Sequence, residues 1–210
     1  QFSEVTESRG LAASEMFMFL YHPQFKLLRS LIESGNLGMI FSISARFCIP
    51  HLDPTNIRYD PEIGGGALFD AGCYPVAACH SLLGNDYSEI SSKIIFDQNY
   101  DVDIRGNAMI TYPSGTSAFL EWGFGMTYSN EIRLRCENAN VLLNRSFSKP
   151  SDLATSVEKI DSSGKRTSLK IDPANHFTIM MDEKCNQTGT EWILRQSSIM
   201  EDILENSGER

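Results

Sequence analysis

Asp70 and Tyr74 are the pair whose residue types and spacing are best suited to chemistry in this sequence. If one helix carries both, residues four apart share a face. A carboxylate beside a phenol suits redox chemistry at a carbinol carbon, because hydride departure requires a proton to leave the same hydroxyl. Tyrosine has an ordinary pKa of about 10, so a nearby cation must favour its ionised form. No lysine lies within this motif.

Three consecutive glycines, Gly64 to Gly66, precede this pair. Glycines let a backbone bend sharply and approach a ligand or a neighbouring domain without Cβ clashes. By spacing alone, the same residues are more often the start of a helix, with a capping group and a half-buried aromatic ring. Both interpretations stay open at this point.

Other reactive side chains give weaker patterns. The four histidines are well separated, and they form no zinc-like spacing with the cysteines, so we expect no metal site. Cys73 beside the motif is expected to be a packed thiol, and Trp122 and Trp192 are expected to be core residues. The five cysteines are odd in number and lack a C-x-x-C pair, which indicates a reducing compartment.

Composition narrows the class of protein. The chain has 210 residues, of which 41% are hydrophobic and 21% charged, as in ordinary globular domains. A net charge of −9 disfavours nucleic acid and anionic membrane surfaces as partners. A cytoplasmic protein fits best. Gln1 is not a natural start, so we expect a fragment or a trimmed chain.

Hydrophobic periodicity predicts the elements that must position the motif. Residues 15–21 form a short apolar run typical of a buried strand, ended by His22-Pro23, and a helix ending at Gly35 should follow. Residues 38–47 alternate, with Met39, Phe41, Ile43, Ala45 and Phe47 on the side predicted to be buried. A helical stretch after the glycines should run to Leu83, with Pro75 kinking it or starting its second part.

The rest of the chain is strand-rich. Strands are predicted at 90–96, 104–112, 116–122, 132–136, 141–143, 156–160 and 167–171, and helices at about 175–184 and 191–204. Strands joined by short turns predict an α+β fold: a largely antiparallel open sheet with helices packed on one face. The uncovered face predicts a homodimer, or a homo-oligomer, that buries it.

Two stretches resemble a known family. The segments IGGGALFDAGCYPV (63–76) and EMFMFLYHPQ (15–24) are similar in order and separation to the C-terminal domain of the Gfo/Idh/MocA oxidoreductases, and looser similarity covers essentially the whole chain. The resemblance implies an upstream Rossmann domain that binds NAD or NADP, with a lysine in a Glu-Lys-Pro motif. Residues 1–12 would then be the remnant of its last helix, and residues 13–210 the substrate-binding and dimerisation domain. No cofactor-binding residue is expected in this chain.

By the same resemblance, Tyr74 is the general acid/base and Asp70 its companion. Arg58 and Tyr21 lie in stretches that line the substrate pocket in relatives. Many relatives have arginine where Leu20 stands, so a polar contact from that position is not expected here. The turn at 137–140 also lacks the glycines common in the family.

The implied function is NAD(P)-dependent oxidation or reduction of a sugar, polyol or nucleotide-linked sugar, with the fragment inactive without its Rossmann domain. Two alternatives remain: a glycosidase of the same family that uses NAD for transient oxidation, and a non-catalytic sugar-binding or dimerisation module.

Overall fold

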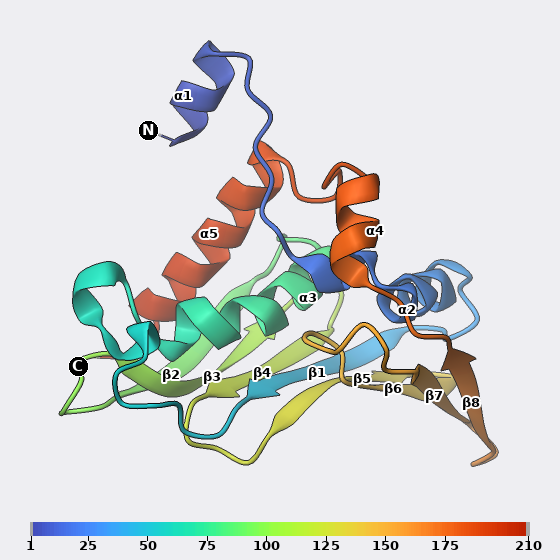
Figure 1. Ribbon diagram of the computed structural model, residues 1–210. Helices are drawn as coiled ribbons and strands as arrows, with labels where there is room; N and C mark the ends of the chain where they lie inside the picture. The colour runs from blue at the N-terminus through green and yellow to red at the C-terminus, as the bar shows by residue number, and fades with distance from the viewer. Residues whose placement is uncertain (1, 209–210) are drawn as a thin grey trace.

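A single open sheet organises the chain (Figure 1). The computed structural model describes residues 2–208. The sheet has eight strands in the order β2-β3-β4-β1-β5-β6-β7-β8. Strands β1 and β4 pair in parallel, and the other neighbours are antiparallel. The strands are β1 (Ile40–Cys48), β2 (Glu89–Phe96), β3 (Asp103–Thr111), β4 (Ser117–Gly123), β5 (Ser129–Cys136), β6 (Ala139–Asn144), β7 (Thr155–Asp161) and β8 (Arg166–Ile171).

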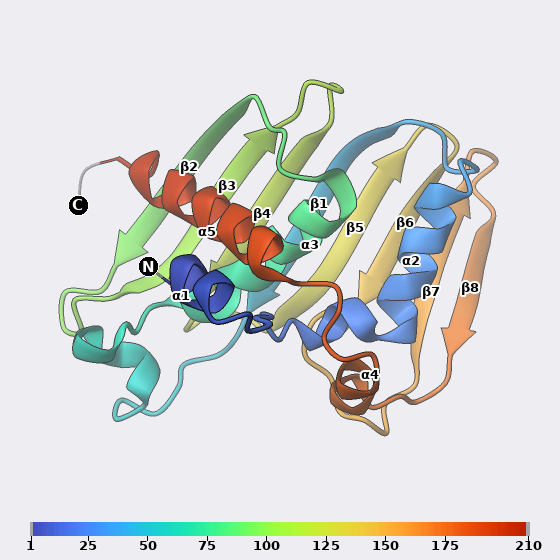
Figure 2. The same cartoon turned by 90° about the horizontal axis from the view of Figure 1, so that it is seen from above.

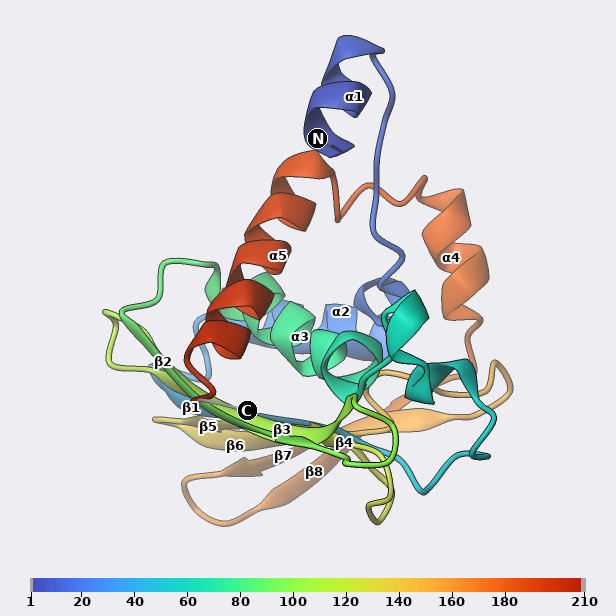
Figure 3. The same ribbon diagram turned by 90° about the vertical axis from the view of Figure 1, so that its left-hand side faces the viewer.

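The helices gather on one face of this sheet, and the opposite face is bare (Figure 3). Figure 2 shows α2, α3 and α5 lying across the strands when the molecule is seen from above. The arrangement confirms the predicted α+β class, with a largely antiparallel sheet covered on one side. The helices are α1 (Phe2–Ser8), α2 (Pro23–Glu33), α3 (Cys73–Leu83), α4 (His176–Asp182) and α5 (Thr190–Glu205).

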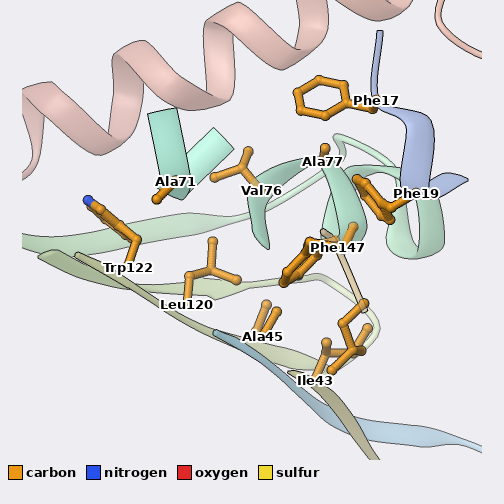
Figure 4. Close-up of a cluster of buried hydrophobic side chains, with 14 of the residues drawn as sticks. Phe17, Phe19, Ile43, Ala45, Ala71, Val76, Ala77, Leu120, Trp122 and Phe147 are labelled. Atoms are coloured by element: carbon orange, nitrogen blue, oxygen red, sulfur yellow. The ribbon is translucent and has the colours of Figure 1, made fainter. Parts of the chain in front are cut away.

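Strand β1 shows how alternation builds the core. Ile43 and Ala45 are fully buried toward the helices, and Trp122 of β4 and Phe147 join them (Figure 4). The prediction was wrong for the start of the strand, where Met39 and Phe41 are 58% and 51% exposed. The pairing of β1 with β5 shifts register between Ile40 and Ser42, and such a bulge changes the face to which neighbouring side chains point.

The predicted strand at 15–21 is also wrong. Met18–Tyr21 form a 3₁₀ turn, η1, and all four side chains are buried. Hydrogen bonds from Leu20 N to Phe17 O and from His22 N to Phe19 O satisfy the backbone locally. A short apolar run does not distinguish a strand from a buried helical turn. His22 then caps α2, because its Nδ1 accepts a hydrogen bond from Gln24 N at 3.1 Å.

The helical stretch after the glycines has two parts, as predicted. Leu68–Gly72 form a π-helical turn, η4, which continues directly into α3. Pro75 is the third residue of α3, near the helix start, where its missing N–H is tolerated.

Helix α1 stands apart from the sheet, joined by an extended segment (Figure 1). Gly10, with a φ of +61°, supplies the left-handed turn predicted after this helix. Of the helices within residues 2–208, none is both long and apolar enough to cross a bilayer.

Candidate functional site

The loop before η4 places Arg58. This loop contains two short 3₁₀ turns, η2 (Ile57–Tyr59) and η3 (Pro61–Ile63). Gly66 N donates to Arg58 O and Gly65 N donates to Asp60 O, both at 2.9 Å. A Cβ at Gly65 would lie 2.7 Å from Arg58 O, so the glycine allows the loop to fold back on itself. The glycine run thus serves loop packing that positions Arg58.

Asp103 fixes the start of η4, and sequence reasoning missed it. Its Oδ2 accepts a hydrogen bond from Leu68 N at 2.7 Å, and a Cβ at Gly66 would lie 2.2 Å from its Oδ1. The side chain is buried, and burial raises the pKa of its carboxyl. In the sequence it is an acid at the start of a strand, and nothing there marks its contact with the glycine run.

Asp70 and Arg58 form an ion pair. Arg58 Nε lies 2.6 Å from Asp70 Oδ2, and the two side chains are 39% and 31% exposed. Asn56 Oδ1 accepts from the Arg58 backbone N–H at 3.1 Å. The structure therefore brings together two of the four expected site residues, and it places a guanidinium beside the carboxylate where the motif has no lysine.

Tyr74 is half-buried in an aromatic cage. Its ring centroid lies 5.3 Å from Phe47 and 5.5 Å from Phe17, both edge-on, with Phe19 and Phe147 each 6.0 Å away. Figure 4 shows Phe17, Phe19 and Phe147 together above the sheet. Edge-on packing on several sides restricts the ring to one orientation.

Burial raises the pKa of Tyr74 to about 12, and the nearby carboxylate of Asp70 adds to this effect. Arg58 opposes it by lowering the pKa. The charges of Asp70 and Arg58 therefore both act on the Tyr74 phenol, although the motif was expected to pair Tyr74 with Asp70 and with a lysine from another domain. Within residues 2–208, these effects leave the phenol protonated near neutral pH.

Glu15 is a further acid in the electrostatic neighbourhood of Tyr74. Burial raises the pKa of its carboxyl. Its backbone is tied to Thr188, since Glu15 N donates to Thr188 O at 3.2 Å and Thr188 Oγ1 donates to Glu15 O at 2.5 Å. Glu15 begins the first family-like segment, and that position is the signal in the sequence that could have singled it out.

Tyr21 does not have the exposed position expected of a substrate contact. Its side chain is fully buried, and its hydroxyl accepts a hydrogen bond from Gln187 N at 2.9 Å. The phenol joins η1 to the segment before α5. We therefore correct its expected role from substrate contact to support of this segment.

The histidines do not gather into a metal site. In the part of the chain that the structure describes, no group of three His, Cys, Asp or Glu side chains is placed to hold a metal ion. His22 and His176 contact each other edge-on with ring centroids 5.8 Å apart, and His80 stacks on Trp192.

Comparison with known proteins identifies the domain. The GFO/IDH/MocA C-terminal domain matches residues 25–141, which are more than half of the chain. The dTDP-3,4-didehydro-2,6-dideoxy-alpha-D-glucose 3-reductase of Actinomadura kijaniata is 36% identical over 146 residues, covering 70% of this chain and 44% of the reductase. A D-xylose 1-dehydrogenase (NADP(+)) of Haloferax volcanii is 28% identical over 142 residues, covering 67% of this chain and 43% of that enzyme.

Solved structures have the same architecture. The crystal structure of a 3-ketoreductase from Actinomadura kijaniata with NADP and TDP-benzene superimposes with a TM-score of 0.90 and 29% identity, covering 97% of this chain and 65% of that one. An aldose-aldose oxidoreductase from Caulobacter crescentus, 17% identical, shares the fold with a TM-score of 0.87, over 98% of this chain and 64% of that one. The chain spans less than half the length of the two relatives matched by sequence. It belongs to the GFO/IDH/MocA family, whose C-terminal domain it matches.

Proposed function

We propose that this chain is the substrate-facing domain of an NAD(P)-dependent oxidoreductase that acts on a sugar or a nucleotide-linked sugar, with Tyr74 as its general acid/base. The observation that carries the proposal is that Tyr74, at the start of α3, lies close enough to the Asp70–Arg58 ion pair for both charges to act on its phenol. The ion pair is partly exposed and the phenol is held in a fixed orientation.

In the proposed reaction, the residues of this chain transfer the proton of the substrate hydroxyl. When alcohol is oxidised to ketone, the carbinol carbon loses a hydride and its oxygen loses a proton, and a bound nicotinamide supplies or accepts the hydride. Tyr74 takes the proton on its hydroxyl oxygen in oxidation and returns it in reduction. Arg58 favours the phenolate by its charge, and Asp70 holds the Arg58 guanidinium in place.

The residues described here do not provide a dinucleotide cradle of their own. Gly65 and Gly66 are packed against Arg58, Asp60 and Asp103, and their N–H groups donate to Asp60 O and Arg58 O, so these two donors are not free for a pyrophosphate. We therefore propose that a Rossmann domain holds the cofactor and that residues 1–12 belong to its last helix, with residues 13–210 as the substrate domain. The relatives' additional length is sufficient for such a domain.

Exposed apolar side chains beside the site suit a docked domain. Ile57, Ile63 and Phe69 flank the ion pair in sequence and are 66%, 62% and 56% exposed. Such a concentration of apolar surface is typical of an interface. We propose that the cofactor domain covers it and forms the opposite wall of the site.

The relatives suggest the substrate and cofactor classes. One is named for a dTDP-linked sugar and another for D-xylose and NADP, and a 3-ketoreductase from Actinomadura kijaniata has been crystallised with NADP and TDP-benzene. We propose a sugar or nucleotide-sugar substrate, with NAD or NADP as cofactor. The five cysteines are free, which supports a reducing, cytoplasmic compartment.

The bare face of the sheet supports a homodimer. Phe119 of β4 and Met109 of β3 are paired neighbours there, and they are 47% and 40% exposed. Ser44 of β1 lies beside Phe119 on the other side. We propose that a second copy of the chain covers this face.

The Tyr74→Phe variant of the full-length protein tests the assignment. Removal of an acid/base group should lower kcat by about 10²- to 10⁴-fold and leave folding intact. Tyr112→Phe is a matched control, because Tyr112 is a buried phenol in the strand layer that the mechanism does not use. Full activity in Tyr74→Phe would refute the assignment. Net reduction of free cofactor by the unmodified protein would exclude a purely hydrolytic cycle.

A further inference from the structure

Pro75 removes one backbone donor from the helical stretch that carries Tyr74. In a π-turn the carbonyl of one residue accepts from the N–H five residues later. For Asp70 of η4 that residue is Pro75, which has no N–H. The Cys73 thiol donates to Asp70 O instead, at 3.7 Å, and a thiol is a weak donor. A hydrogen bond from another element would therefore add to the support of the segment that carries the proposed acid/base.

Gln196 of α5 supplies that support. Its side chain is buried, at 3% exposed, and its Nε2 donates to Cys73 O at 3.1 Å. The Cys73 carbonyl belongs to the peptide unit that joins Cys73 to Tyr74. Because a carbonyl only accepts, the Gln196 amide must present its nitrogen there and its oxygen to His80. His80 Nδ1 lies 3.3 Å from that oxygen, so Nδ1 must carry the proton of the neutral imidazole.

The same helix also supports the ring of Tyr74. Trp192, one turn before Gln196, stacks on His80 with ring centroids 4.6 Å apart. It also contacts Phe17 at 5.4 Å, and Phe17 contacts the Tyr74 ring at 5.5 Å. One face of α5 thus restrains both the backbone and the ring of Tyr74.

We propose that Gln196 is a positioning residue for the acid/base: through the Cys73 carbonyl it holds the peptide unit of Tyr74, and His80 orients the Gln196 amide. This inference rests on the proposed role of Tyr74. Gln196 does not touch the substrate in this arrangement. Its loss should therefore change the rate of proton transfer and leave substrate binding nearly unchanged.

The test uses two substitutions of Gln196 in the full-length enzyme. Gln196→Met keeps the length of the side chain and removes both hydrogen bonds. Gln196→Glu keeps an acceptor for His80 and loses the donor to Cys73 O when the carboxylate is ionised. We expect both variants to lower kcat per folded enzyme by about 10- to 100-fold, the scale of a small misplacement of a catalytic group, with KM changed by less than about threefold.

A second measurement separates positioning from general damage. Hydrogen–deuterium exchange should be faster across residues 68–77 in both Gln196 variants. Ile203→Val, two turns further along α5 in the buried core, is the control for lost packing and should leave kcat and this exchange unchanged.

The outcomes distinguish the two proposals. If Tyr74→Phe is inactive and both Gln196 variants keep kcat within twofold of the unmodified enzyme, the positioning role is refuted and the proposed function stands. A rise in KM with unchanged kcat would also refute positioning, because it indicates a role in binding. If Tyr74→Phe is fully active, the proposed function itself fails.

Discussion

Lys149 should make the stability of this domain depend on pH near neutrality. Its side chain is 7% exposed, and its Nζ donates to Gln24 Oε1 and Ser146 O, both at 3.0 Å. Among residues 2–208 no carboxylate pairs with it. Burial lowers the pKa of Lys149 from 10.5 to about 7. An ammonium ion in this position is costly, because two neutral acceptors compensate only part of its desolvation.

The sign follows from proton binding in the two states. Between pH 7 and pH 10 the unfolded chain keeps its proton on Lys149, whereas the folded chain loses it. The unfolded state therefore binds more protons, so the contribution of Lys149 to the free energy of unfolding rises with pH. Where the unfolded state binds one proton more than the folded state, each pH unit raises the free energy of unfolding by about 1.4 kcal/mol. Integration from pH 6.5 to pH 8 gives a rise of about 1.2 kcal/mol.

The assay is urea unfolding at several pH values for the unmodified protein and for Lys149→Met. The other titrating groups are present in both proteins, but the charge of Lys149 also lowers the pKa of His22 and of His176, so the difference between the two free energies reports Lys149 together with its coupling to these two rings. This difference should shift in favour of the unmodified protein by about 1.2 kcal/mol from pH 6.5 to pH 8. Lys170→Met, at an exposed position of β8, is the control and should show no such shift.

Parallel pH curves for the unmodified protein and Lys149→Met would refute the reasoning. They would show that the ammonium group reaches water in the folded state. The absolute stability of the variant is a poorer measure, because the substitution also leaves Gln24 Oε1 and Ser146 O without this donor.

Three further perturbations test other parts of the structure. Gly106→Ala should lower the free energy of unfolding by about 1–3 kcal/mol in urea titrations, because its Cβ would lie 2.4 Å from the Trp122 ring; unchanged stability would contradict this packing. Phe119→Asp should convert the proposed dimer to a monomer in light scattering, and a dimer that persists would place the interface elsewhere. Arg58→Met in the full-length enzyme should move the limb of the activity profile that Tyr74 sets, acidic in oxidation and alkaline in reduction, to higher pH, since Arg58 lowers the pKa of Tyr74; an unmoved limb would remove Arg58 from that role.

Local patterning predicted most of the fold because most of its elements are set by near neighbours. The hairpin at Pro113 to Gly115 and the alternation through Ile43 and Ala45 need only turn chemistry and one buried face. The predictions were wrong where contacts between residues far apart in the sequence determine the local conformation. Phe41 is exposed because of a bulge against β5, and the run ending at Tyr21 is a turn because the core encloses it.

The site was predictable only in part for the same reason. Spacing placed Asp70 and Tyr74 on one helical stretch, but the ion pair with Arg58 depends on a loop that folds back through Gly65 and Gly66. The support from Asp103 comes from a distant strand. Hydrogen bonds between residues so far apart leave no periodic signal in the sequence.

The pKa of Tyr74 indicates which charge the proposed cofactor domain should bring to the site. Burial and the nearby acids raise the pKa of the phenol to about 12, although Arg58 acts in the opposite direction. A phenol with that pKa is a poor base near neutral pH, because almost none of it is ionised. For Tyr74 to act as a base near neutral pH, the cofactor domain proposed above would have to bring a second positive charge close to the phenol, such as the lysine that the family resemblance implies. Without that charge, the fixed ring and the neighbouring ion pair would position the hydroxyl but leave it protonated.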